Sequence, residues 1–339
     1  MKRVPYFLFY MFVAMSAIFF MDQRMAGAFS GHPVLVGGAT NDWIGTAPSE
    51  PNSWTISGGE YIWKDGVGDD TGNGSYTYPL QKALKGGCDL REFRLTYDDK
   101  NLYLLIKCDR PGDFWPPLRI IGIHKEGMVG GMTVLAQGDA NEPNFDKGVS
   151  ANLKVAPELA CQYVIAISSS AYKGRIWDAE GKLVARKEGE KNDTPGFKVE
   201  GVNWNHVEAA IPLELIGGSP AGQVWKVIIA IGQQDFDVAR KIDVDASEWN
   251  GGGGAPNNSN PYIYDLAGAD KETQEKELGS YNLNAPFGDP DGFAVIAKSF
   301  LKIDFSNEGP GKLSRRGENG TETGFLSGVG VFFPALLSR

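Results

Sequence analysis

Short β-rich runs recur along the chain, separated by glycine, proline, asparagine and aspartate, while long stretches with helical periodicity are nearly absent. The 44 glycines and 19 prolines punctuate these runs instead of forming one low-complexity tract. Many short strands bounded by turn residues are typical of two stacked sheets. We therefore expect an all-β protein, a two-sheet antiparallel β-sandwich.

The strands and two short helices can be placed from the same pattern. Strands are predicted at Trp54–Trp63, Leu90–Tyr97, Leu102–Lys107, Leu118–His124, Gly131–Ala136, Val149–Val155, Cys161–Ser168, Arg175–Trp177, Lys182–Arg186, Phe197–Gly201, Val207–Ile211, Val224–Gly232 and Phe293–Phe305. A helix is predicted at Pro212–Ile216, because proline suits the first helical position. Another is predicted at Lys271–Gly279, where Asp270 can cap the first turn.

The three cysteines permit at most one disulfide bond within the chain. They are Cys88, Cys108 and Cys161. Pairing Tyr97 with Leu102 aligns apolar side chains across a hairpin and places Cys108 opposite Arg91. A bond between Cys88 and Cys108 then requires a bulge, and Cys161 remains an alternative partner.

The N-terminus has the pattern of a signal peptide. Lys2 and Arg3 precede an almost wholly apolar run, Val4–Met21, and Ala26–Ala28 supplies small residues for cleavage. This site favours cleavage over a retained membrane helix. Residues 1–28 are therefore predicted to be removed, and the protein is expected outside the cytoplasm.

The mature chain divides into one domain and a C-terminal extension. Residues 29–305 are predicted to form the β-sandwich. Residues 306–324 are polar and glycine-rich, which indicates a linker. Residues 325–339 form a short apolar tail, either an unstructured or strand-like end or a tail that associates with the cell envelope.

Charge and missing motifs narrow the classes of function. A formal net charge of −9 disfavours nucleic acid and anionic lipid as partners, whereas neutral glycans and cations remain compatible. The chain lacks a nucleophile elbow, a zinc-protease motif and a phosphate-binding glycine loop. Its histidines, His32, His124 and His206, are scattered, and nothing selects two catalytic carboxylates among 42 acidic residues. Catalysis is not expected.

A loop after the first predicted strand is acidic and glycine-rich. Asp65, Asp69 and Asp70 place three carboxylates within six residues. Glycines allow such a loop to fold around an ion, and carboxylate oxygens are the ligands that Ca²⁺ prefers. The alternatives are a calcium site at these three residues and a solvated acidic turn.

Tryptophan placement suggests a second kind of site. Trp115 and Trp249 lie in loop contexts, and Trp177 is compatible with either a core or a ligand-binding position. Exposed aromatic faces stack on the C–H surfaces of sugars, while neighbouring polar groups bind the hydroxyls. These three tryptophans are the candidate carbohydrate-binding residues.

Several blocks of the sequence resemble one family in order. They are Trp63–Pro79, Arg240–Trp249 with Gly251–Gly254, Asn260–Leu266 and Gln274–Tyr281. Together these blocks resemble the glucodextranase C-terminal domain family, over roughly residues 50–285. Asp42–Thr46 is similar to the entry strand of the wider group of DOMON-like proteins and family 9 carbohydrate-binding modules.

This resemblance implies a two-sheet sandwich of the kind attached to secreted α-glucan-degrading enzymes or to surface-layer-linked proteins. It implies carbohydrate binding, sometimes with structural calcium. We therefore expect a non-catalytic, secreted or cell-surface protein that binds a polysaccharide, with α-glucan as the candidate. The alternatives are a cell-envelope or surface-layer scaffold tethered by its tail and a haem-binding DOMON-like protein, which would need His or Met axial ligands.

Overall fold

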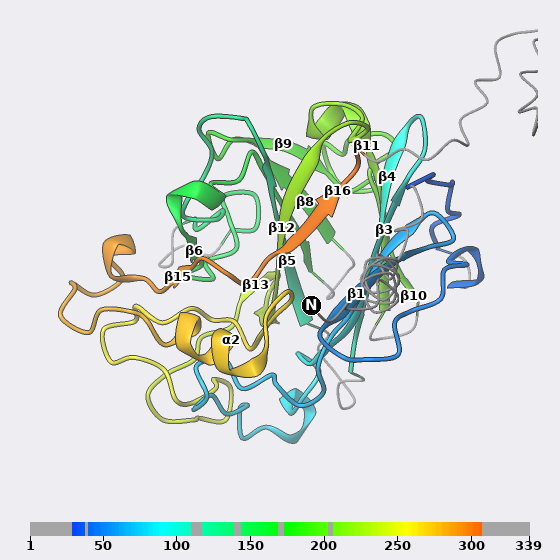
Figure 1. Ribbon diagram of the computed structural model, residues 1–339. Coiled ribbons are helices and arrows are strands. Elements are labelled where there is room, and N and C mark those ends of the chain that lie inside the picture. The colour runs from blue at the N-terminus through cyan, green and yellow to red at the C-terminus, as the bar shows by residue number, and fades with distance from the viewer. Residues whose placement is uncertain are drawn as a thin grey trace, which may run out of the picture.

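The computed structural model describes residues 29–37, 40–109, 117–138, 144–168, 173–202 and 206–306. The predicted signal peptide, Trp115, and the predicted tail with nearly all of the linker lie outside these residues. The described part consists mainly of strands in antiparallel sheets, which confirms the all-β prediction (Figure 1).

The first sheet has six strands. In spatial order they are β1 (Ser53–Ser57), β2 (Glu60–Lys64), β3 (Leu90–Tyr97), β4 (Asn101–Cys108), β11 (His206–Pro212) and β10 (Lys198–Val202).

The second sheet has eight strands. Six of them form the path β13 (Val238–Ala239), β12 (Val224–Asp235), β5 (Pro117–Lys125), β7 (Tyr163–Ser168), β8 (Lys173–Trp177) and β9 (Leu183–Arg186). The strands β14 (Asp265–Leu266) and β16 (Leu301–Asp304) also pair with β12. A separate parallel pair joins β15 (Val295–Ile296) to β6 (Lys154–Val155).

Helices are few and short. The α-helix α2 (Lys271–Leu278) begins where the side chain of Asp270 accepts a hydrogen bond from the backbone of Thr273. The 3-10 turns are η1 (Thr40–Asp42), η2 (Lys82–Leu84), η3 (Pro157–Leu159), η4 (Leu213–Ile216) and η5 (Pro290–Gly292). Both predicted helices are confirmed in position, the first of them as the single turn η4.

The core lies between the two sheets. Period-2 alternation directs Phe93 and Leu95 of β3 toward the same buried cluster as Ile121 of β5 and Val227 of β12. Burying such apolar faces is the main favourable contribution to folding. The opposite face of β4, with Tyr103 and Leu105, is buried in a second, smaller cluster.

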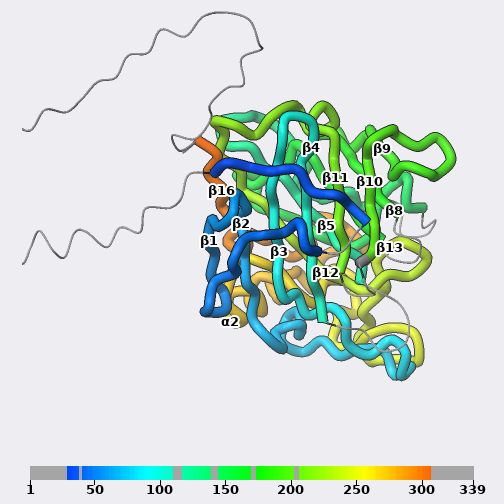
Figure 2. Tube along the Cα trace, turned by 90° about the vertical axis from the view of Figure 1, so that its right-hand side faces the viewer, coloured from blue at the N-terminus to red at the C-terminus, as the bar shows by residue number. Residues whose placement is uncertain are grey.

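An N-terminal strap, residues 29–37 and 40–45, covers that opposite face of the six-stranded sheet. In Figure 2 the dark blue chain crosses over β3, β4 and β11. Trp43 of the strap packs in the smaller cluster and donates its indole N–H to the buried carboxylate of Glu208 at 2.9 Å. Phe29 anchors the beginning of the strap, stacked on Tyr97 with ring centroids 5.4 Å apart.

The predicted strand Trp54–Trp63 is wrong as a single strand. The chain forms two strands, β1 and β2, around a turn at Gly58 and Gly59. Both glycines have positive φ, 62° and 80°, as a two-residue hairpin turn requires. The sequence therefore contains a hairpin where its apolar pattern suggests one long strand.

The predicted hairpin of β3 and β4 is confirmed in register, with Tyr97 opposite Leu102. Near its open end an irregularity between Leu90 and Glu92 places Leu90, not Arg91, opposite Cys108. All three cysteines are buried free thiols. Burial raises the pKa of Cys108 to about 12.

Other predicted strands are shorter than the apolar runs that suggest them. Gly131–Ala136 contributes only isolated bridges, and the run Val149–Val155 contributes only β6. Ala136, Ser150 and Asn152 have positive φ, which an extended ladder does not allow. The run Phe293–Phe305 is likewise divided into β15 and β16.

Candidate functional site

Three carboxylates from distant parts of the sequence meet beside the end of β2. Asp65 follows β2 directly, Asp69 lies in the loop that continues from it, and Asp265 is the first residue of β14. One oxygen of each carboxylate lies within 4.8 Å of the other two, and all three residues are buried. This spacing suits the ligands of a hard divalent cation.

A fourth carboxylate, Asp89, lies beside these three. Asp89 accepts a hydrogen bond from the backbone of Gly68 at 3.0 Å and pairs with Arg91 at 2.9 Å. Its charge acts on both Asp65 and Asp265. Asp65, Asp69, Asp89 and Asp265 are called the acidic cluster below.

Hydrogen bonds orient two carboxylates of the cluster, those of Asp65 and Asp265. Asp65 accepts from the indole N–H of Trp63 at 2.6 Å. Asp265 accepts from the backbone N–H of Leu90 at 2.6 Å and from that of Leu266 at 2.8 Å. These hydrogen bonds hold one oxygen of Asp65 and both oxygens of Asp265, and they therefore fix the orientation of these two carboxylates.

Helix α2 and a glycine position the loop that carries Asp69. Gln274 donates to the backbone carbonyl of Asp69 at 2.6 Å and accepts from the backbone of Leu266 at 2.6 Å. A side chain at Gly66 would meet the Asp69 carboxylate, since its Cβ would lie 2.3 Å from Oδ2. Glycine therefore allows the carboxylate to fold back over the loop.

The protein supplies fewer hydrogen bonds than the buried oxygens of the cluster can accept. Among the described residues, Oδ2 of Asp65, Oδ1 of Asp69 and Oδ1 of Asp89 are buried without a hydrogen-bond partner. Burial is the main cause that raises the pKa of Asp65, Asp69 and Asp265, and it raises that of Asp89 to about 7. Buried oxygens of this kind are costly unless a cation or a proton compensates them.

Asp70, the third carboxylate of the predicted calcium site, is not among the three whose oxygens meet within 4.8 Å. Its carboxylate accepts a hydrogen bond from the hydroxyl of Tyr78. The Tyr78 ring stacks on Tyr264, with centroids 4.5 Å apart. Asp70 therefore anchors an aromatic pair, whereas Asp65 and Asp69 are brought together as expected.

Trp249 lies on a loop that is attached to the end of β12. The guanidinium of Arg240 donates to the Trp249 carbonyl at 2.8 Å, to the Gln234 carbonyl at 3.2 Å and to the Asp235 carboxylate at 3.2 Å. The Trp249 side chain is nevertheless 50% exposed. A large aromatic side chain is thus held in solvent by a fixed backbone.

Phe236 is displayed at the same end of β12, one residue after Asp235. It forms the β12–β13 turn with Asp237 and is 83% exposed, with a positive φ of 49°. Positive φ is rare for a bulky side chain. The Asp237 carboxylate accepts from Ser168 and Lys173, both at 2.6 Å, which fixes the turn.

Two exposed aliphatic residues belong to segments joined to the Trp249 loop by backbone hydrogen bonds. Leu80 is 64% exposed, and its backbone bonds to the carbonyl of Ser247, in the loop that carries Trp249. Val244, which is 50% exposed, accepts a backbone bond from Gly253 in the same region. Leu80, Phe236, Val244 and Trp249 are called the Trp249 surface below.

The glycine run that follows Trp249 is explained by close packing. A Cβ at Gly251 would lie 2.2 Å from the Tyr264 hydroxyl, and one at Gly254 would lie 2.1 Å from the Ile242 carbonyl. The run therefore passes through a gap too narrow for side chains. It connects the Trp249 loop to the stacked rings of Tyr78 and Tyr264.

Residues 61–287 of the chain match the model of a known family. The matching family is the C-terminal binding module, SLH-like, of glucodextranase. This chain belongs to that family. No curated protein gives a significant match to the chain. The acidic cluster and the Trp249 surface both lie within the matched residues of this glucodextranase-type module.

Trp177, the second candidate tryptophan among the described residues, lies in the core of this module. It lies on β8, is 1% exposed and packs edge-on against Phe145, with centroids 6.2 Å apart. Its position on a buried strand face places it in the core. Trp115 lies outside the described residues, so of the three candidate tryptophans Trp249 alone is seen at the surface.

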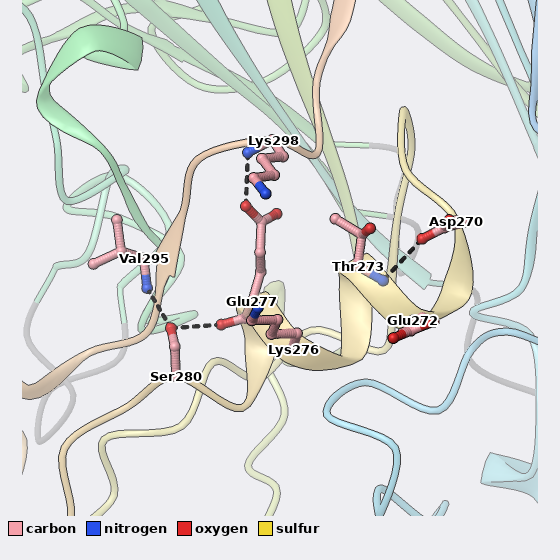
Figure 3. A pocket seen from close by; sticks show the side chains of 8 residues that line it. All are labelled: Asp270, Glu272, Thr273, Lys276, Glu277, Ser280, Val295 and Lys298. Atoms are coloured by element: carbon pink, nitrogen blue, oxygen red, sulfur yellow. Dashed lines mark hydrogen bonds between the residues drawn. The ribbon is translucent and has the colours of Figure 1, made fainter.

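A groove of about 450 Å³ lies between α2 and the segment around β15 (Figure 3). The Glu277 carboxylate at its centre accepts hydrogen bonds from the backbone of Ala297, Lys298 and Ser299. These bonds commit Glu277 to joining α2 to the following segment. The groove has no aromatic side chain in its lining and offers no stacking platform.

Sequence reasoning missed Asp89 and Asp265, because neither is near Asp65 in the chain. One signal was present at each position. Asp265 interrupts the apolar run Tyr262–Ala267, and Asp89 lies between Cys88 and a buried strand. A charged residue inside an apolar run is rarely buried without a partner.

Of the two described histidines with ring hydrogen bonds, His32 has partners at both ring nitrogens, whereas His124 has one at Nδ1. Nε2 of His32 lies 3.2 Å from Glu60, and Nδ1 of His124 lies 2.9 Å from the carbonyl of Ala160. Among the described residues, no helix is both long and apolar enough to cross a bilayer.

Proposed function

We propose that this protein is a non-catalytic, extracytoplasmic binder of a neutral polysaccharide, and that sugar rings stack on the Trp249 surface. The observation that carries the proposal is the half-exposed Trp249 ring on a loop fixed by Arg240. Aromatic side chains combine a large apolar face with low conformational entropy loss on binding. A preorganised ring therefore binds a ligand at low entropic cost.

Polar groups beside the Trp249 surface suit the hydroxyls of a sugar. Asn250 donates to the Asp243 carboxylate at 2.7 Å, next to Trp249 in the chain. Asp235 lies next to Phe236. With a net charge of −9, the protein repels polyanions, so a neutral glycan is the compatible ligand.

The family supports an α-glucan as the glycan. The module is described as the binding module of glucodextranase, and its SLH-like character supports a location at the cell surface. The N-terminal pattern at residues 1–28 supports export.

Affinity electrophoresis tests this proposal. Native protein is run through gels that contain amylopectin, dextran or xylan, beside a gel without polysaccharide. We expect retardation in at least one α-glucan gel. Unretarded migration in all three gels would remove carbohydrate binding as the function.

A matched pair of variants locates the site. Trp249→Ala is expected to weaken the retardation at least about tenfold, because it removes the aromatic ring that the bound sugar would cover. Trp54→Ala is the control, because Trp54 is 51% exposed but lies on the edge strand β1. Loss of retardation in the control and not in Trp249→Ala would place the site elsewhere.

We also propose that the acidic cluster binds Ca²⁺. Asp65, Asp69 and Asp265 supply one oxygen each within 4.8 Å, and Asp89 adds a fourth carboxylate. When ionised, these four carboxylates carry four negative charges, and Arg91 pairs with one of them, Asp89. Hard oxygen ligands of high charge density favour Ca²⁺ over transition metals.

Terbium luminescence tests the calcium site directly. Trp63 donates to Asp65 at 2.6 Å, so an ion bound there lies close enough to an indole for sensitised Tb³⁺ emission. We expect emission on addition of Tb³⁺ and its displacement by Ca²⁺. Asp265→Asn should weaken Tb³⁺ binding at least about tenfold, the loss that even removal of an outer-shell partner can cause.

Asp98→Asn is the control for this test, since Asp98 lies at the far end of β3 and accepts hydrogen bonds from Lys100 and Tyr103 in the β3–β4 turn. It is expected to leave Tb³⁺ affinity within about twofold. Equal losses in the two variants, or absence of emission from the native protein, would contradict the calcium proposal.

The SLH-like description favours a second candidate function, a cell-envelope scaffold. In this case residues 325–339 would tether the protein to the envelope. Cell fractionation of the full chain and of a chain ending at residue 306 separates the two candidates. If both forms wash from cells equally, the tether is excluded.

A further inference from the structure

Lys125, the last residue of β5, is a buried cation surrounded by aromatic rings. Its side chain ends 5.0 Å from the ring centroid of Trp225 and 5.3 Å from that of Tyr163. The ammonium donates to the carbonyl of Ile216 at 2.5 Å. The residue is 3% exposed.

A pocket of about 480 Å³ opens beside this lysine. Lys125 forms part of its wall together with Gly127, Gly217, Gly222 and Val224. Three of the lining residues are glycines, so parts of the wall carry no side chain, while Glu126, Met128 and Gln223 complete the lining. The volume is in the range of sites that hold small molecules.

Gly217 brings the amine and a hydroxyl together. It ends η4 with a positive φ of 76°, a conformation that favours glycine. A Cβ at this position would lie 2.9 Å from the Tyr163 hydroxyl and 3.2 Å from the Lys125 amine. A side chain at this position would therefore contact both the hydroxyl and the amine, whereas glycine leaves the space beside them open.

The surroundings of Lys125 favour a reactive amine. Burial lowers its pKa to about 8, from an ordinary value of 10.5. A larger fraction of the amine is therefore neutral near physiological pH than in an exposed lysine, as in enzymes that form Schiff bases. Burial raises the pKa of Tyr163, so its hydroxyl keeps its proton.

We propose that Lys125 is a covalent capture site for small aldehydes, including the open-chain end of a reducing sugar. The amine lone pair attacks the carbonyl carbon, and the carbonyl oxygen takes up a proton to give a carbinolamine. The nitrogen then loses its remaining proton, the hydroxyl group leaves as water, and the C=N bond of an imine forms. Tyr163 is placed to donate the proton to the leaving hydroxyl group.

This site is separate from the Trp249 surface. Lys125 pairs with Trp225 at one end of β5, whereas Pro117 pairs with Gln233 at the other end, near Arg240. At the usual rise per residue the two ends lie roughly 26 Å apart. Failure of polysaccharide binding and failure of aldehyde capture are therefore independent results.

Reductive trapping tests the proposal on the native protein. Glycolaldehyde and cyanoborohydride are added at pH 7.5, and the labelled lysines are identified by peptide mass spectrometry at low conversion. We expect Lys125 to be labelled at least about tenfold faster than Lys302 and Lys271, because its neutral fraction is larger. Lys302 is 59% exposed and Lys271 is 50% exposed, so equal or faster labelling there would overturn the proposal.

Two further arms separate imine chemistry from simple exposure. Tyr163→Phe keeps the ring over Lys125 and removes the hydroxyl, and it should slow labelling of Lys125 at least about threefold while Lys302 is unchanged. Glucose should label Lys125, whereas methyl α-glucoside, which has no free aldehyde, should not. Unchanged labelling in Tyr163→Phe would refute the role of the hydroxyl, and labelling by methyl glucoside would refute imine formation.

Discussion

Lys125 makes the stability of this protein depend on pH at the scale of one residue. Its folded-state pKa of about 8 lies below the 10.5 of an ordinary lysine. Between these two values the unfolded chain binds more protons than the folded chain. Stability therefore rises with pH through this window.

The variant Lys125→Met is predicted to lose that rise. Methionine fills similar space without a charge. The free energy of unfolding of the variant should therefore stay constant between pH 8 and pH 9.5, whereas that of the native protein should increase. Urea unfolding of both proteins at pH 7, 8, 9 and 9.5 measures the difference. Tyr163 and Glu126, the titratable neighbours of Lys125, are present in the native protein and in the variant. Parallel curves of unfolding free energy against pH for the two proteins would therefore contradict a lowered pKa of Lys125.

Single residues also show what the sequence can and cannot predict about the candidate site. Asp65 and Asp69 were predictable because they share one glycine-rich loop. Asp265 was not, because its contact with Asp65 depends on how β14 pairs with β12. The contact of Asp70 was not predictable either, because spacing cannot tell which way a side chain turns, and here it turns toward Tyr78.

At the scale of elements, the N-terminal strap is the feature that a strand prediction does not include. It buries Trp43 to 7% exposure and supplies the partner of the buried Glu208 carboxylate. The hairpin of β3 and β4 was predictable from cross-strand apolar matches. The strap was not, because it has no regular period along the chain.

Trp43→Ala is predicted to destabilise the protein by about 3–5 kcal/mol. It removes a large buried ring and leaves one Glu208 oxygen without its donor. Trp54→Ala should cost no more than about 1.5 kcal/mol, since Trp54 is 51% exposed and its ring stacks on Tyr61 at the sheet edge. Chemical denaturation of both variants checks this, and equal losses would mean that the strap contributes little.

At the scale of the whole molecule, the acidic cluster joins the two sheets. Asp65 follows β2 and Asp89 precedes β3, both in the six-stranded sheet, whereas Asp265 belongs to β14 of the other sheet. A cation held by all of them would connect the layers at one end of the sandwich. Helix α2 covers the same loop through Gln274.

Removal of calcium is therefore predicted to lower the stability of the entire fold. With Ca²⁺ at a hundredfold excess over its Kd, the folded state gains about 2.7 kcal/mol. Thermal unfolding in Ca²⁺ and in EDTA measures the effect, with Mg²⁺ as a comparison. Identical midpoints in Ca²⁺ and EDTA would contradict a role for calcium in holding the sheets together.

The overall sandwich was predictable because turn residues and short apolar runs repeat along the chain. The lengths of individual strands were not, because residues such as Asn152 adopt positive φ inside an apolar run. Trp177 shows the same limit, since its sequence context fits either a core strand or a binding loop, and the structure places it in the core.

Isothermal titration with heptasaccharides tests the central claim most directly. Maltoheptaose and isomaltoheptaose are titrated in calcium buffer into the native protein, Trp249→Ala and Trp54→Ala. We predict binding of at least one sugar to the native protein, a Kd at least about tenfold weaker in Trp249→Ala, and an unchanged Kd in Trp54→Ala. Equal Kd values for all three proteins, or no binding of either sugar, would contradict the Trp249 surface as a glycan-binding site.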